Sequence, residues 1–224
     1  MHSLAKNRIL FLTPNFSHIM GYCIFSFAAD VEQVKKVFDS HDSLLFDQIQ
    51  DNDVFKNYAS QDLDNQLSTK EALRQIIHGE PYKKHSAHAY WYALISIFAF
   101  LGPQLPYNQD IEIDNETEMI DSYLKSDFGI ETVVAEILLN NFPDLGLPDV
   151  STFPLAGAIS PNQIHLLSNE LQKVILTNKQ IDMLWHTQIE KDETKAFIYN
   201  SIKGFKENID FCNDNNLSLI SFCH

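Results

Sequence analysis

The chain has 224 residues, 45% of them hydrophobic, so it is long enough to bury a sizeable core. Thirty Asp and Glu residues against 16 Lys and Arg give a formal net charge of −14. Such a charge repels phosphate backbones and anionic lipid, so we expect neither nucleic acid nor a membrane surface as a partner. A basic protein partner stays open, beside the simpler explanation that the charge keeps the protein in solution.

The cysteines and the amino terminus indicate a cytoplasmic protein. Cys23, Cys212 and Cys223 are odd in number and form no CxxC or Cys/His ligand pattern, so we expect free thiols. Cys23 and Cys223 become neighbours if the segments that carry them pair as strands. Residues 1–18 are expected to form an arm with a short edge strand at 8–12. Apolar runs near this end resemble a signal peptide, but polar residues between them and the lack of a cleavage site disfavour export.

The first half of the chain predicts a strand followed by helices. Residues 21–28 are rich in aromatic and β-branched side chains, which is typical of a core strand. Asp30 has the position of a helix cap, a second helix is expected at 42–50, and residues 51–67 are polar and acidic. The clearest helix follows, because Ser68 and Glu71 form a capping box and Gly79 ends the apolar stripe.

Residues 87–101 predict the central helix of the fold. Only Ser96 is plainly polar between residues 89 and 101, and Gly102 with Pro103 ends the segment. A membrane span needs about 20 apolar residues, so we expect a helix buried inside a water-soluble domain. Four of its side chains are predicted to be almost fully buried, namely Trp91, Leu94, Ile95 and Phe98.

The second half of the chain predicts five more helices and a closing strand. Helices are expected near 116–125, from Asp127 onward, from Ser160 onward, near 179–191 and over 193–213. The helix after Ser160 should carry a buried stripe that includes Ile175. Residues 141–161 hold four of the eight prolines and predict a long ordered loop, here called the strap. Residues 217–223 are apolar on both faces, as expected of a strand inside a sheet.

These elements together predict an α+β fold. Helices should pack around residues 87–101, and one small sheet should contain both 21–28 and 217–223 as neighbours. No repeat, low-complexity tract or linker divides the chain, so residues 19–224 are expected to form a single domain.

No catalytic motif stands out. GxGxxG, the P-loop, GxSxG and HExxH are all absent. His85 and His88 have the i, i+3 spacing that can place two imidazoles on one metal ion, but a third ligand is not evident, so we expect no metal and no cofactor.

Residues 110–121 contain six acids and no base. Asp110, Glu112 and Asp114 alternate as in a calcium loop, but the sixth position of such a loop needs glycine and here it is Asn115. A solvated acidic loop is therefore favoured over a calcium site.

Several segments in succession carry a resemblance to a known family. These are GYCIFSFAADVEQVKKVF, KEALRQIIHGEP, YWYALISIFAFLG, LPDVSTFPLAGAISPNQI and the terminal LSLISFCH. Together they resemble an uncharacterised bacterial family of small domains of unknown function, distantly similar to YfbM-like proteins, over most of residues 20–224. In this chain the glycine of the strap motif is displaced, and a cysteine stands where the family's closing motif has tyrosine. The resemblance implies a compact α+β domain and assigns no catalytic residue.

Two functions follow as hypotheses. The first is a non-catalytic, acidic protein-binding module of antitoxin or immunity type. Its acidic stretches at residues 39–64 and 110–121 are expected to form one face, which captures a basic protein with Asp110, Glu112 and Asp114 as binding residues. The alternative is a small-molecule enzyme or binding protein with a cleft between the strap and the central helix, where His88 and Tyr92 would line the pocket.

Overall fold

The computed structural model describes residues 22–61, 66–150, 152–187 and 189–224. The predicted arm at 1–18, with its edge strand at 8–12, and the first residue of the predicted strand at 21–28 lie outside these ranges. Within them the fold is α+β, as predicted, with ten α-helices and a four-stranded antiparallel sheet. The strands are β1 (Cys23–Ala29), β2 (Ile111–Glu112), β3 (Leu155–Ile159) and β4 (Ser218–Cys223). The helices are α1 (Val31–Lys35), α2 (Ser43–Asp51), α3 (Asp53–Ser60), α4 (Thr69–His78), α5 (Ala87–Leu101), α6 (Asn115–Phe128), α7 (Val134–Leu138), α8 (Pro161–Leu171), α9 (Asn178–Trp185) and α10 (Glu190–Asn215).

The two ends of the described chain meet in the centre of the sheet. The strand order is β2-β1-β4-β3, and β1 pairs with β4 from Ile24 opposite Cys223 to Ala29 opposite Ser218. This confirms that the first and last predicted strands are neighbours in one sheet. The backbones of both strands therefore satisfy each other's hydrogen bonds, which neither strand could do alone.

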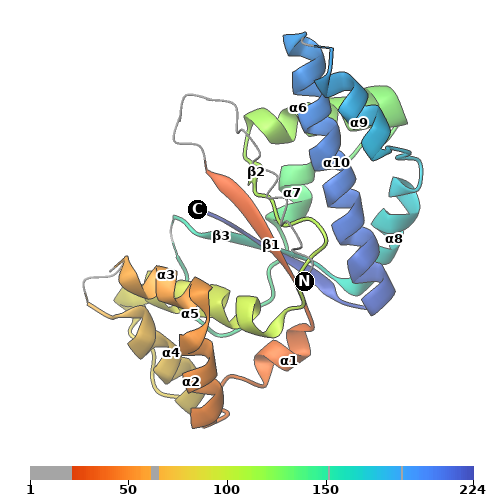
Figure 1. Ribbon diagram of the computed structural model, residues 1–224. Coiled ribbons are helices and arrows are strands. Elements are labelled where there is room, and N and C mark those ends of the chain that lie inside the picture. The colour runs from red at the N-terminus through yellow and green to blue at the C-terminus, as the bar shows by residue number, and fades with distance from the viewer. Residues whose placement is uncertain (1–21, 62–65, 151, 188) are drawn as a thin grey trace, which may run out of the picture.

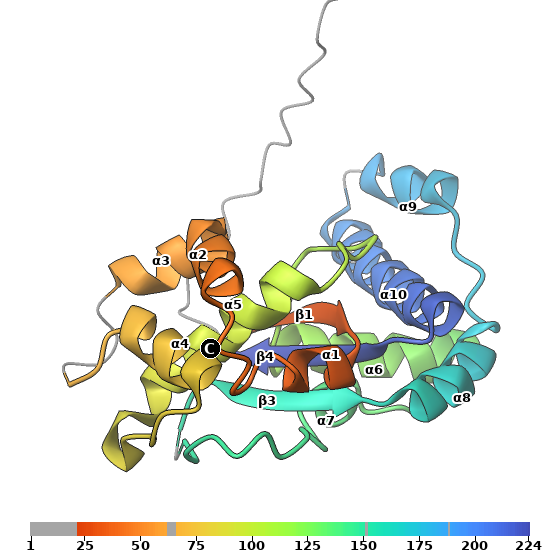
Figure 2. The same ribbon diagram turned by 90° about the horizontal axis from the view of Figure 1, so that it is seen from below.

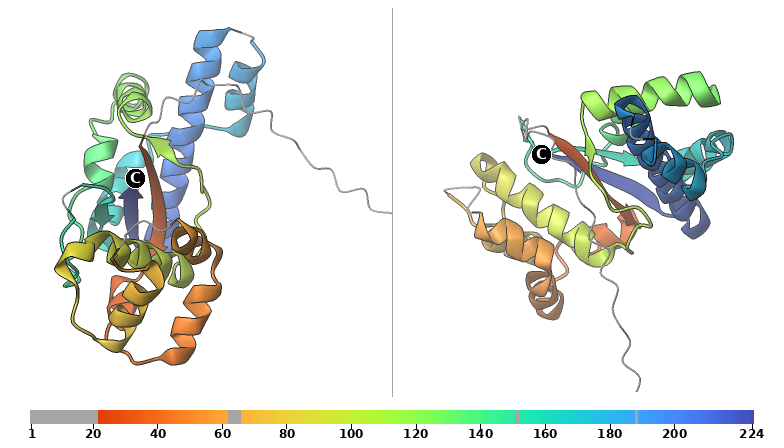
Figure 3. Two further views of the ribbon diagram at one scale, coloured as in Figure 1. Left: turned by 90° about the vertical axis from the view of Figure 1, so that its left-hand side faces the viewer. Right: turned by 45° about the horizontal axis from the view of Figure 1, so that its top comes forward.

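Helices cover both faces of the sheet, so the fold has three layers (Figures 1 and 3). Side chains of a strand point alternately to opposite faces. In β1 and β4, Phe27 and Phe222 join one core with the helices α1 to α5, while Ile24 and Leu219 join a second core with the helices α6, α7, α8 and α10. Figure 2 shows the sheet between the two groups of helices.

Helix α5 spans the predicted residues 87–101 and lies in the first core. Leu94, Ile95 and Phe98 are fully buried, as expected. Trp91 is only partly buried, contrary to the prediction, because its indole Nε1 reaches out to donate a hydrogen bond to the Pro148 carbonyl of the strap (2.9 Å).

The capping signals give correct helix ends at several places. The Ser68 side chain accepts a hydrogen bond from the Glu71 N–H, and Gly79 adopts a left-handed conformation (φ 64°) after α4. Asp30 caps α1, and Ser160 forms a capping box with Gln163 at the start of α8.

Three predictions need correction. Helix α3 lies in the polar and acidic residues 51–67, where no helix was predicted, and it buries Phe55 and Tyr58. No helix begins at Asp127: this residue belongs to the last turn of α6, which ends at the left-handed Gly129 (φ 66°). Ile175 is 74% exposed, because α8 ends four residues before it.

The strap is also more regular than predicted, since it contains β3. Gly157 is required there, because a Cβ atom would clash with the Leu138 carbonyl oxygen and the backbone of Leu139 and Asn140. No helix of the described residues is long and apolar enough to span a membrane.

Candidate functional site

The three predicted acids lie together at one edge of the sheet. Asp110 directly precedes β2, Glu112 lies in β2 opposite Cys23, and Asp114 precedes α6 with a positive φ of 69°. We call this region the β1–β2 edge. Within the described residues, no group of three His, Cys, Asp or Glu side chains is placed to hold a metal ion.

The β1–β2 edge is strongly negative. Asp110, Glu112 and Asp114 form no ion pair with any described residue, whereas acids elsewhere do, such as Asp127 with Lys195 (3.0 Å). Partial burial, and then the charges of Asp110, Glu112 and Glu116, raise the pKa of the Cys23 thiol. This shift in the pKa is the expected response of a thiol to a negative potential.

Glu116 extends the negative charge into the interior. Its side chain is 4% exposed, and its Oε1 accepts a hydrogen bond from the Ser201 hydroxyl (2.6 Å) while Oε2 accepts one from the Glu112 N–H (2.9 Å). Burial raises the pKa of this carboxyl, and the two hydrogen bonds oppose the shift. Sequence analysis did not single out Glu116, because its burial depends on α10 packing over the first turn of α6.

The two acidic stretches, residues 39–64 and 110–121, do not share one layer, contrary to the expectation that they form a single face. Helices α2 and α3 carry the first stretch and cover one face of the sheet, while α6 carries most of the second and covers the other face. Asp110 precedes β2 at the edge of the sheet, and its charge adds to the desolvation that raises the pKa of Tyr58 in α3 and of Cys23 in β1.

A cluster of rings surrounds the imidazole of His224, on the α5 side of the sheet. The ring of His224 lies 5.3 Å from that of Phe25, 5.6 Å from that of Tyr58 and 5.9 Å from that of Tyr92. The Tyr58 hydroxyl and Nε2 of His224 are 2.9 Å apart, within hydrogen-bonding distance. Desolvation by these rings lowers the pKa of His224, and Asp110 opposes the shift.

Of the residues predicted to line a pocket, the structure brings Tyr92 to this cluster but not His88. Tyr58 and His224 went unnoticed in the sequence, although the alternation of β4 places His224 on the same face as Phe222. His88 instead approaches the strap, with its Nε2 3.4 Å from Oγ1 of Thr152.

The interface between the strap and α5 is packed with side chains. The rings of Trp91 and Phe142 lie 5.2 Å apart, and Leu145 and Leu147 pack against the same core. The cleft expected in this place is therefore filled by the strap's own apolar residues.

None of the three cysteines has the properties of a nucleophile. No disulfide joins any two of them in the described part of the chain, and burial raises the pKa of Cys212 to about 12 and that of Cys223 to about 11. Cys23 and Cys223 are close, as expected if their strands pair. Cys223 lies opposite Ile24, the residue after Cys23, so the two cysteine side chains point to opposite faces of the sheet. Thiols with raised pKa values are protonated at neutral pH and unreactive.

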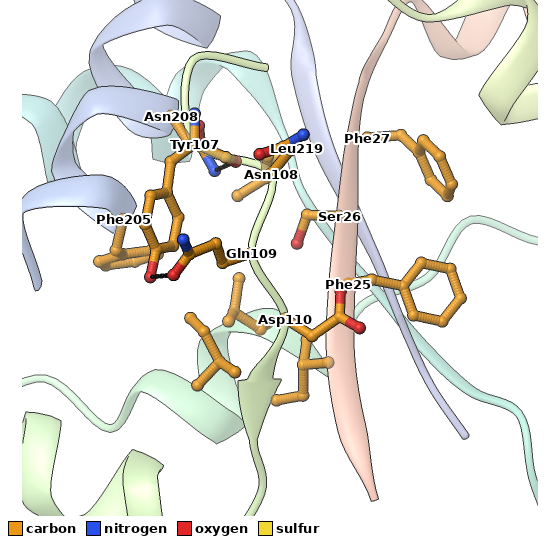
Figure 4. A pocket seen from close by; sticks show the side chains of 13 residues that line it. Phe25, Ser26, Phe27, Tyr107, Asn108, Gln109, Asp110, Phe205, Asn208 and Leu219 are labelled. Carbon is orange, nitrogen blue, oxygen red and sulfur yellow. Dashed lines mark hydrogen bonds between the residues drawn. The ribbon is translucent and has the colours of Figure 1, made fainter. Parts of the chain in front are cut away.

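A cavity of about 180 Å³ lies behind the β1–β2 edge, between β1, α10 and residues 107–111. Figure 4 shows Ser26, Gln109 and Phe205 around it. Asn208 holds one wall in place, because its side chain accepts a hydrogen bond from the Tyr107 N–H (2.9 Å) and donates one to the Tyr107 carbonyl (2.8 Å). The Tyr107 ring packs directly on Gly204, where any Cβ atom would clash with it.

An aromatic pair, the exposed Tyr22 and the partly buried Phe153, adjoins the edge. Tyr22, immediately before β1, is 48% exposed and stacks on Phe153, with ring centroids 3.7 Å apart. The Tyr22 carbonyl accepts a hydrogen bond from the Ile113 N–H (2.9 Å), which fixes the pair beside β2.

Comparison with known proteins places the chain in a family. A family model described as "Domain of unknown function (DUF7691)" matches residues 20–224. The chain belongs to this family. The match agrees with the resemblance to a domain of unknown function noted in the sequence. No curated protein and no solved structure matches the chain.

Proposed function

We propose that the protein is a non-catalytic binding module that captures a basic protein at the β1–β2 edge, in the manner of a bacterial antitoxin or immunity protein. The observation that carries the proposal is a set of carboxylates at this edge, Asp110, Glu112 and Asp114, which form no ion pair with a described residue and lie beside the exposed Tyr22 ring. Unneutralised charge of one sign steers a partner of the opposite sign.

The pair of Tyr22 and Phe153 adds a large, rigid contact surface, which the charges alone do not provide. Tyrosine is enriched among the residues that dominate binding energy, because it buries a large rigid surface and keeps a polar tip. Tyr22 is held by its stack on Phe153 and so loses little conformational freedom on binding.

The test begins with a photo-crosslinking amino acid at Tyr22 in the source organism. A protein trapped there is identified, purified and titrated against the wild-type chain. We expect association to slow between 0.01 M and 0.15 M salt, as the Debye length contracts from about 30 Å to about 8 Å.

Two triple variants separate a specific site from general acidity. The first reverses Asp110, Glu112 and Asp114 to lysine; the control reverses the exposed Asp47, Asp149 and Asp182, which gives the same change in net charge at other places. Only the first variant should lose binding. Equal losses in both variants, or a Tyr22 position that traps no protein, would refute the proposal.

The alternative function is a small-molecule enzyme or binding protein. The cavity behind β1 supports it, and the predicted cleft between the strap and α5 does not. The strap is packed against α5, but the cavity behind β1 has room for a small ligand.

A further inference from the structure

The antiparallel ladder between β1 and β2 stops before Ser26. Its last pair is Ile24 opposite Ile111, while β1 continues to Ala29. The register would place Gln109 opposite Ser26. Residues 107–110 instead bend toward α10, where Asn208 holds both backbone groups of Tyr107. The cavity of about 180 Å³ occupies the space left by this bend.

The backbone N–H and C=O of Ser26 point toward this cavity. Cys23 and His224 exchange two backbone hydrogen bonds, so alternate residues of β1, including Phe25 and Phe27, bond to β4. Ser26 and Ser221 then form a non-bonded pair, in which side chains come closest, and their Oγ atoms are indeed 2.8 Å apart. The backbone groups of Ser26 consequently face the other side, where the described residues provide no strand.

The remaining walls are mostly apolar. Ile24, Leu138 and Leu219 are each 1% exposed, and Phe205 is 2% exposed. Among the lining residues that the structure describes, Asp110 is the one charged residue, and Figure 4 shows its carboxylate directed past β1 toward the Phe25 side. The interior of the cavity therefore suits a neutral ligand, because no described side chain places a charge there to compensate a buried ion.

We propose that the cavity binds a small, neutral, planar molecule with a hydrogen-bond donor and acceptor side by side, such as a lactam or a heterocycle with an amide edge. One such edge pairs with the N–H and C=O of Ser26 and completes the interrupted ladder. The ring lies against the apolar walls. The size is sufficient, since a cavity of about 150 Å³ admits benzene.

The test uses 2-pyridone as the probe and follows backbone amide signals of the wild-type protein by NMR. The Ser26 amide signal should move saturably, with a dissociation constant on the order of 1 mM, as expected for a ligand of this size. N-methyl-2-pyridone has the same ring without the donor and should bind about tenfold more weakly, the effect of one lost hydrogen bond. An unmoved Ser26 signal, or equal binding of both compounds, overturns the proposal.

Two variants of Ser26 assign the contact to the backbone. Ser26→Ala removes only the hydroxyl and should keep the affinity for 2-pyridone. Ser26→Pro removes the N–H without breaking the ladder to β4, since proline is tolerated where the N–H faces an edge, and should weaken binding about tenfold. Loss of binding in Ser26→Ala contradicts the backbone assignment. If Ser26→Pro does not fold, the comparison of the two ligands on the wild-type protein decides.

Discussion

Replacement of Phe98 by alanine tests whether α5 organises the first core. The side chain is fully buried, and its ring lies 5.8 Å from that of Phe222 in β4 and 6.3 Å from that of Phe142 in the strap. A truncation therefore weakens contacts among three elements that are far apart in the sequence. The lost transfer free energy and the cavity left behind should cost about 3–5 kcal/mol. The aromatic pairs account for roughly 0.5–1.5 kcal/mol each of such contacts.

Urea unfolding followed by circular dichroism measures this cost. For a domain of this size each kcal/mol lowers Tm by about 2–4 °C, so the variant should melt roughly 6–20 °C below the wild type. The slope against urea should not change, because the surface exposed on unfolding is nearly the same. Leu44→Ala is the control: this side chain is 67% exposed, and its loss should change stability by no more than about 0.5 kcal/mol.

A cost below about 1 kcal/mol for Phe98→Ala, with an unchanged slope, would refute the reasoning. Such a result would mean that neighbouring side chains fill the cavity left by the truncation, or that α5 does not connect the strap to the sheet.

Three further changes have expected outcomes. Gly157→Ala should cost more than about 2 kcal/mol in thermal unfolding, since the Cβ atom clashes with rigid backbone at Leu138, whereas Gly146→Ala adds a Cβ atom in open space and should cost only about 1–2 kcal/mol from its left-handed backbone. Glu116→Gln should gain stability relative to the wild type as the pH rises above 4.5. The raised pKa means that folding favours the protonated carboxyl, so wild-type stability falls as the pH rises through the folded-state pKa. His224→Phe should lessen the loss of stability as the pH falls below 6.5, because the lowered pKa means that the folded state binds its proton less readily than the unfolded state. Constant stability differences across these pH ranges would contradict the last two expectations.

The sequence predicted those elements whose signals are local and unopposed. Helix α5 needs only a long apolar run and a glycine, and α4 and α8 are bounded by side chains that bond their own backbone. The pairing of β1 with β4 was predictable because both are short, apolar and unable to satisfy their backbones alone.

Elements with conflicting local signals were missed. Strand β3 has Gly157 at its centre and follows a proline, so its composition resembles a loop; only the close approach of Leu138 and Asn140 explains the glycine. Asp127 has the residue type of a helix start, but Gly129 two positions later ends α6. Helix α3 buries only Phe55 and Tyr58, too few to give a clear periodicity.

Only part of the candidate site could be predicted from the sequence, because some of its residues meet through long-range contacts. Its acids stand close together in the sequence and could be found there, whereas Tyr58 and His224 are 166 positions apart and meet only through the sheet. The residues next to Tyr58 and next to His224 in the sequence give no sign that these two side chains are in contact.

The short β2 strand gives the acids of the β1–β2 edge a second physical effect, which the proposed experiment can separate from partner binding. Charged residues at an exposed sheet edge oppose pairing with the edge of another molecule, and lysine serves as well as an acid in this respect. Reversal of Asp110, Glu112 and Asp114 to lysine therefore keeps the protection against aggregation but inverts the sign that a basic partner would meet. If the variant stays monomeric and no longer binds its partner, binding depends on the negative sign of the charge. The acids then recognise the partner, in addition to preventing the sheet edge from pairing with another molecule.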